Sequence, residues 1–91
     1  MDKLEQKICD IIDGKKDEII AFGRDIWTHA ELGYREFRTA GKFTDVLKSL
    51  GIETVEGLAV TGVKGYLKGT DYKGTTVALM GEYDALPIAN H

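Results

Sequence analysis

The spacing of apolar residues changes at Gly51, and this change restricts the folds that the chain can form. Before Gly51, apolar residues recur every three or four positions, as they do on one face of an amphipathic helix. After Gly51 the period is two, as in strands with one solvated face. The predicted helices are 2–13, 16–30 and 36–50, and the predicted strands are 52–55 and 63–68. Helices followed by strands predict the α/β fold class.

A further strand is predicted at TTVALM, residues 75–80, an apolar run with two threonines and a valine. Such a run is typical of a strand covered on both faces in the middle of a sheet. The chain supplies few other strands to flank it, so the sheet is predicted to be the first part of something larger. Because an unpaired edge of this kind pairs with other chains, we expect a homo-oligomer formed through it.

Composition excludes several classes of function. The 91 residues make at most one small domain, and a net charge of −3 without a basic stripe argues against nucleic-acid binding. No apolar run approaches the roughly 18 residues of a membrane helix, and the charged N-terminus does not indicate a signal peptide. A single cysteine, Cys9, fits the reducing cytoplasm, where it is expected to be a core or boundary residue rather than a reactive thiol.

Two carboxylates directly follow the predicted strand 75–80. Glu82 and Asp84 are two residues apart, so in an extended chain both side chains leave from one face. Such a pair can bind a metal, orient a histidine, or act as acid and base. It can equally consist of surface acids that end a strand. Pro87 would then stiffen the exit from the segment, and the bond before it can be cis.

The two histidines, His29 and His91, do not complete a metal site with these acids. His29 lies at the end of a predicted helix and is expected to be a capping or surface residue. His91 is the last residue. Zinc takes three or four protein ligands, and the residues present do not supply them. No glycine-rich loop joins a strand to a helix, which argues against a nucleotide-binding half-domain.

Three stretches taken in order resemble a known family. They are IWTHAELGYREFRTA, TGVKGYLKG and VALMGEYDALP, and together they resemble the zinc-dependent amidohydrolase and aminoacylase/carboxypeptidase family. The form GEYDALP is most similar to the branch with aminobenzoyl-glutamate, indole-acetyl-amino-acid and N-acyl-amino-acid hydrolases. The sequence departs from the family at Ala30, where proline is frequent, and at Trp27, where some members have histidine.

The resemblance implies a fold, a reaction and a set of roles. It implies a zinc-aminopeptidase-like three-layer α/β/α domain, of which residues 1–91 are the N-terminal part of the catalytic domain, with no second domain. The implied reaction is hydrolysis of the amide bond of an N-acyl amino acid or short peptide with two divalent metal ions, usually zinc. Asp84 would orient a histidine that binds metal, and Glu82 would line the substrate pocket. His91 would open a His-Ala-Cys-Gly-His ligand motif.

The other metal ligands of the family would lie outside residues 1–91. We therefore expect this chain alone to bind no metal and to have no hydrolase activity. The alternative is a small non-enzymatic α/β module for binding or self-association. A monomer with a sharp, cooperative unfolding transition would count against a truncated domain and would favour a module that is complete in itself.

Overall fold

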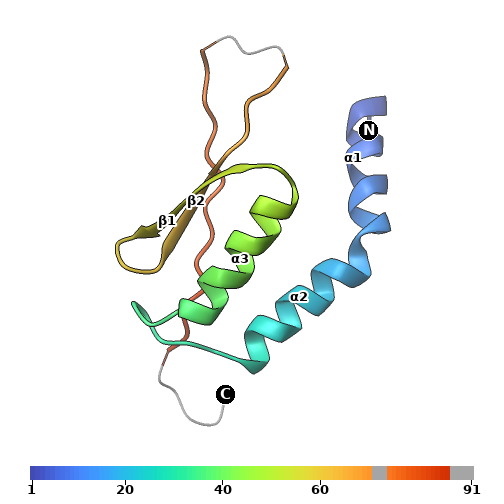
Figure 1. The fold of residues 1–91 in the computed structure, drawn as a ribbon. Helices are drawn as coiled ribbons and strands as arrows, with labels where there is room; N and C mark the ends of the chain where they lie inside the picture. The colour runs from blue at the N-terminus through green and yellow to red at the C-terminus, as the bar shows by residue number, and fades with distance from the viewer. Residues whose placement is uncertain (71–73, 87–91) are drawn as a thin grey trace.

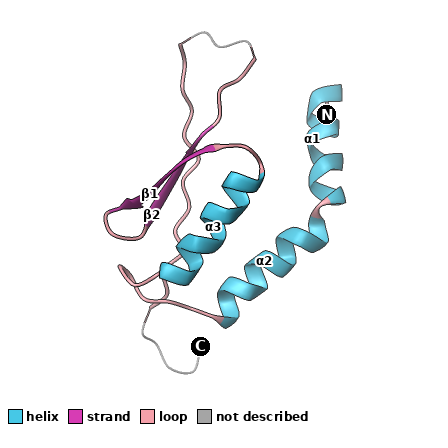
Figure 2. Ribbon diagram, in the orientation of Figure 1, coloured by secondary structure: helices cyan, strands magenta, loops and turns pink. Residues whose placement is uncertain are grey.

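The computed structural model describes residues 1–70 and 74–86, as three helices followed by a β-hairpin (Figure 1, Figure 2). In chain order the elements are α1 (Lys3–Gly14), α2 (Lys16–Thr28), α3 (Phe37–Ser49), β1 (Glu53–Leu58) and β2 (Gly62–Tyr66). The α/β class is confirmed, and each predicted helix and hairpin strand lies within a few residues of the observed one. Gly51, after α3, has a φ of 73°, the left-handed conformation in which helices commonly end and which glycine adopts without strain.

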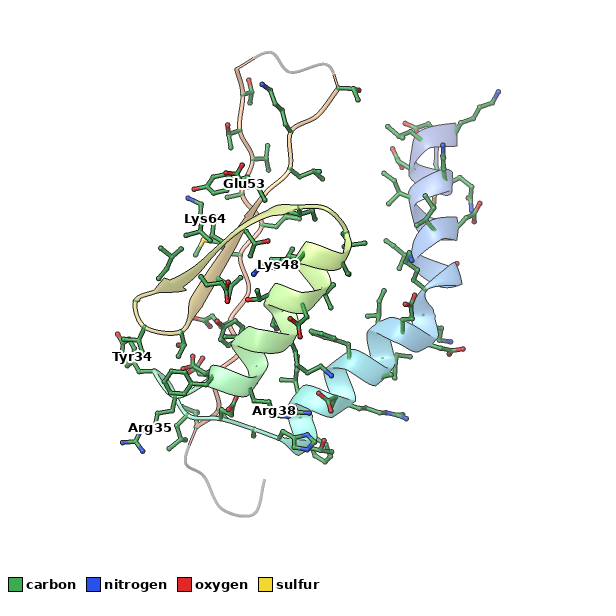
Figure 3. The ribbon with its side chains drawn as sticks, in the orientation of Figure 1. Tyr34, Arg35, Arg38, Lys48, Glu53 and Lys64 are labelled. Atoms are coloured by element: carbon green, nitrogen blue, oxygen red, sulfur yellow. The ribbon has the colours of Figure 1, made fainter. Side chains whose placement is uncertain are left out.

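The hairpin packs against α3. Strands β1 and β2 are antiparallel, and the register shifts between Val55 and Leu58 near the turn. Gly65 of β2 lies under the side chains of α3 and the loop after it, because a Cβ there would be 3.0 Å from Ile52 Cγ2 and 3.3 Å from Leu47 Cδ1. Lys48, at the end of α3 (Figure 3), forms a salt bridge of 3.1 Å with Glu56 of β1. The close approach of Gly65 to the side chains of Ile52 and Leu47 holds the hairpin on the helix, and the ion pair adds little because both of its side chains are more than half exposed.

The molecule is elongated, and α1 lies furthest from the hairpin (Figure 1). Its extents are 45 × 28 × 21 Å, and its radius of gyration is 15.7 Å. A compact domain of this length would have a radius of gyration of about 12 Å. Every residue of α1 is exposed, and no apolar residue in the described ranges is fully buried. Because burial of apolar surface is the main stabilising contribution to folding, this arrangement has a small stability margin.

The prediction of a buried strand at 75–80 is wrong. These residues form no strand, and Val77, Leu79 and Met80 are 83%, 98% and 95% exposed. A central strand needs a hydrogen-bonding neighbour on each edge and a covering layer on each face. Within the described ranges no other strand lies beside this segment. The expectation that Cys9 is a core or boundary residue is also wrong, since it is exposed on α1.

None of the described helices is both long enough and apolar enough to cross a lipid bilayer.

Candidate functional site

The predicted acids lie together at one concave surface, here called the 82–84 hollow. It has a volume of about 400 Å³. Three segments form it: the loop before α3, the hairpin turn, and the stretch that carries Glu82 and Asp84. Its lining residues are Gly33, Tyr34, Glu36, Leu58, Ala59, Thr61, Gly62, Val63, Gly81, Glu82, Tyr83 and Asp84. Both carboxylates are on exposed residues, so the hollow is open to solvent and negatively charged.

The backbone on the C-terminal side of Asp84 is attached to the loop before α3. The N–H of Ala85 donates a hydrogen bond of 2.7 Å to the carbonyl of Glu31, and Leu32 and Ala85 form a parallel β-bridge. Asp84 lies against this loop, because a Cβ on Gly33 would be 3.8 Å from Asp84 Oδ2. The parallel bridge therefore fixes the position of Asp84 relative to the start of α3.

Tyr83 holds the same segment from its other face. Its ring stacks on Phe43 of α3 at a centroid distance of 5.3 Å, and its hydroxyl donates a hydrogen bond to the carbonyl of Thr61. The buried Thr61 hydroxyl in turn donates a 3.0 Å hydrogen bond to Glu36 Oε1. Burial raises the pKa of the Tyr83 hydroxyl, and the charge of Glu36 raises this pKa further, so the hydroxyl stays protonated and able to donate.

Sequence reasoning missed Tyr83, Thr61 and Glu36. Only one signal was present: in an extended segment, the residue between two outward acids points the opposite way, toward the protein.

The sequence of the hairpin turn did not indicate its backbone conformation. Ala59 and Val60 have φ angles of 47° and 79°, and Tyr34 has one of 63°, so non-glycine residues with positive φ lie at or beside the hollow. Such angles are uncommon in non-glycine residues and tend to occur at functional sites.

Glu31 fixes the start of α3, next to the hollow. Its carboxylate accepts hydrogen bonds from the backbone N–H groups of Thr39 at 2.7 Å and Arg38 at 3.1 Å. These N–H groups belong to the first turn, which has no partner within the helix. Desolvation raises the pKa of Glu31, but the hydrogen bonds from Thr39 and Arg38 outweigh it and leave this pKa below its ordinary value.

A polar cluster joins α2 to α3 on the side away from the hairpin. Arg38 Nη1 and Nη2 each lie 2.9 Å from a carboxylate oxygen of Asp25, and Lys42 Nζ lies 2.9 Å from Asp25 Oδ2 (Figure 3). Hydrogen bonds from Arg38 and Lys42 hold the pKa of Asp25 well below its usual range. His29 caps the C-terminal end of α2, with Nδ1 at 2.9 Å from the carbonyl of Asp25. The prediction that His29 is a capping or surface residue is confirmed.

The described residues do not complete a metal centre by themselves. Residues 1–70 and 74–86 contain no group of three or more histidine, cysteine, aspartate or glutamate side chains able to hold an ion. Glu82 and Asp84 alone supply fewer ligands than the three or four that zinc takes. The expectations about Pro87 and His91 lie outside the described residues.

The fold and the hollow define an α/β protein with paired carboxylates at an open concave surface. Its sequence is 36% identical over 89 residues to thermostable carboxypeptidase 1 of Saccharolobus solfataricus, covering 97% of this chain and 21% of that protein. It is 32% identical over 84 residues to an N-acyl-L-amino acid amidohydrolase of Geobacillus stearothermophilus, covering 92% of this chain and 22% of that protein. An IAA-amino acid hydrolase of Arabidopsis thaliana, ILR1-like 5, is 39% identical over 72 residues, covering 79% of this chain and 16% of that protein.

Over this stretch the chain belongs to the amidohydrolase and carboxypeptidase family, which confirms the resemblance seen in its motifs. The chain spans about a fifth of the length of the carboxypeptidase and the bacterial amidohydrolase. No protein-family model matches the sequence, and no solved structure matches the chain.

Proposed function

We propose that the chain forms the N-terminal part of the catalytic domain of a hydrolase that cleaves the amide bond of N-acyl amino acids or short peptides. The observation that carries this proposal is that Glu82 and Asp84 line one hollow in a chain homologous to amide-cleaving enzymes. The names of the relatives support the substrate class, and the open hollow supports access for a small polar substrate.

The two carboxylates have different proposed roles. Asp84 lies beside Gly33 in the loop before α3, and the next residue, Ala85, is hydrogen-bonded to the same loop. Asp84 is therefore proposed to orient a histidine by accepting a hydrogen bond from its ring. Glu82 precedes the attached stretch and is proposed to line the substrate pocket. We further propose that the whole enzyme uses two divalent metal ions, with His91 as a ligand and the remaining ligands outside the described residues. When bound, such ions would polarise the amide carbonyl and activate water.

A segment exchange tests this function. Residues 1–91 would replace the matching stretch of the Saccharolobus carboxypeptidase, and release of the amino acid from N-acyl amino acids and short peptides would be measured. We expect the chimera to retain hydrolysis. An Asp84→Asn substitution in it should lower kcat about 10- to 100-fold, the usual effect of losing a group that orients a ligand. The matched control is Asp45→Asn, an exposed acid on α3 outside the hollow, which should have no effect.

Two results of this exchange would contradict the proposal. A chimera that folds but releases no product would contradict the function. Equal activity of the Asp84→Asn and Asp45→Asn variants would contradict the role of Asp84. The purified 91-residue chain alone is proposed to be inactive and to bind no zinc. Turnover by that chain, abolished by a chelator, would overturn this part.

Self-association is a second candidate function, which the exposed segment 75–80 favours. The stretch 74–81 contains no charged residue, so the same stretch of a second copy could pair with it without opposing like charges. We expect sedimentation to show concentration-dependent association of the chain, and Leu79→Lys to abolish it. The control is Leu67→Lys, at a residue that is 82% exposed but outside this segment. A monomer at all concentrations would contradict this candidate.

A further inference from the structure

The segment 82–85 is attached to the protein by two contacts that leave its acidic side chains exposed. At Tyr83 the attachment is made by the side chain, to Phe43 and to the carbonyl of Thr61. At Ala85 it is made by the backbone, to the carbonyl of Glu31. Asp84 lies between these two contacts. Residues 74–81 form no helix or strand, and Leu79 and Met80 are almost fully exposed.

The two residues that Tyr83 contacts, Phe43 and Thr61, are themselves held by further contacts. Phe43, on which its ring stacks, is in edge-to-face contact with Phe22 of α2 at a centroid distance of 5.0 Å. Thr61, whose carbonyl accepts from Tyr83, is 5% exposed and is itself hydrogen-bonded to Glu36, which is 8% exposed. The side chain of Tyr83 thus joins the segment to both the helices and the hairpin turn.

We propose that Tyr83 is a positioning residue, whose contacts with Phe43 and Thr61 turn its exposed neighbours Glu82 and Asp84 toward the hollow. The physical reason is the alternation of side chains in an extended chain: fixing one side chain inward sends its two neighbours outward. Asp84 has a fixed contact on each side, whereas Glu82 has one only on its C-terminal side. Loss of the Tyr83 contacts would therefore release Asp84 from one of its two constraints. This inference rests on the proposed function only for its consequence in catalysis.

Amide hydrogen exchange in the full 91-residue chain tests the positioning role without any activity. Tyr83→Phe keeps the ring for stacking but removes the hydroxyl donor. We expect it to speed exchange of the Ala85 amide about tenfold, the change expected for one lost hydrogen bond, while amides inside α3 keep their protection. Tyr83→Leu removes both contacts and should speed this exchange further. The matched control is Tyr66→Phe, on β2 outside the hollow, which should leave Ala85 unchanged.

Two outcomes would overturn the proposal. One is exchange at Ala85 that is unchanged by Tyr83→Phe. The other is equal loss of protection at Ala85 and throughout α3, because Tyr83 would then stabilise the whole fold rather than this segment. Should Tyr83→Leu fail to fold, the near-isosteric Tyr83→Phe variant still decides the question.

The segment exchange separates this inference from the proposed function. In the active chimera, Tyr83→Phe should lower kcat more than it changes KM, because the substitution alters the placement of Asp84 and removes only a hydroxyl that is bonded to the carbonyl of Thr61. Faster exchange at Ala85 together with an inactive wild-type chimera would support the positioning role and contradict the proposed function. An active chimera with unchanged exchange at Ala85 would support the proposed function and contradict the positioning role.

Discussion

Glu31 Oε1 accepts a 2.7 Å hydrogen bond from the backbone N–H of Thr39, eight residues further along the chain. Together with the bond from Arg38, this contact makes Glu31 the side-chain cap of α3, although it lies outside the helix. Glu36, the residue that directly precedes α3, makes no side-chain capping bond. The first turn of α3 therefore depends on a loop residue, and this loop also attaches the segment with Asp84.

Replacing this cap should destabilise the protein. Glu31→Ala leaves two N–H groups of α3 without their acceptor and should lower the free energy of unfolding by about 1 kcal/mol, as for other lost helix caps. Urea unfolding followed by circular dichroism measures this, since α-helix dominates the signal. The control is Glu18→Ala, an exposed acid of α2, which should have a smaller effect. Equal effects of the two substitutions would show that Glu31 does not cap α3.

Stability should decrease in acid. The folded-state pKa of Glu31 lies below its ordinary value of 4.5, and that of Asp25 lies below its ordinary value of 3.8. The unfolded chain therefore binds more protons than the folded one in this range, and stability rises with pH there. The contribution of Glu31 is fully present above its ordinary pKa and is lost as pH falls through the folded-state value. Thermal unfolding of wild type and Glu31→Gln across this range should show a weaker pH dependence for the variant. Identical profiles would contradict the assigned shift.

The pair of Arg38 and Asp25 should depend on the planar, forked shape of the guanidinium group. Arg38→Lys keeps the positive charge but cannot make two parallel hydrogen bonds to one carboxylate, so we expect a lower unfolding temperature. The difference should shrink in high salt, which screens partly exposed charges. Arg35→Lys in the preceding loop is the control, because its side chain points away from the cluster (Figure 3). A variant as stable as wild type in low salt would contradict a structural role for the fork.

Relieving backbone strain in the hairpin turn should raise the stability of the protein. Val60 has a φ of 79°, a conformation that costs a β-branched residue about 1–3 kcal/mol, and its side chain is 60% exposed. Val60→Gly should therefore stabilise the protein by about 1 kcal/mol, after allowing for the greater freedom of glycine in the unfolded chain. Val63→Gly, in β2, is the control and should destabilise, because glycine weakens a strand. A loss of stability in Val60→Gly would show that the turn is not strained.

The sequence indicated what each segment would do locally but not which segments would meet. The three helices were predictable because each carries its own periodic pattern, as in Leu4, Ile8 and Ile11 of α1. The run 75–80 was wrongly predicted to be a buried strand. Its apolar composition shows that such a strand would need neighbouring strands and covering layers, but it does not show whether they are present. Glu82 and Asp84 were found from their spacing. The contact of Tyr83 with Thr61, 22 residues earlier, depends on how the hairpin turn packs and has no local signature.

The closing pair of the hairpin should tolerate no side chain at Gly62. A Cβ there would lie 2.5 Å from the carbonyl oxygen and 3.2 Å from the Cβ of Leu58, its partner in the register. Gly62→Ala must therefore separate β1 from β2 at the turn and distort the hollow, at a cost of about 1–3 kcal/mol. The control is Gly41→Ala in α3, where a Cβ meets nothing within 4 Å. It should stabilise the helix by about 1 kcal/mol.

Because the fold has a small stability margin, the effect of Gly62→Ala is best measured in the Gly41→Ala background. Circular dichroism is the better probe, because Trp27 is already 71% exposed in the folded protein and its fluorescence would change little on unfolding. A double variant as stable as Gly41→Ala alone would mean that the hairpin turn closes differently from the arrangement described.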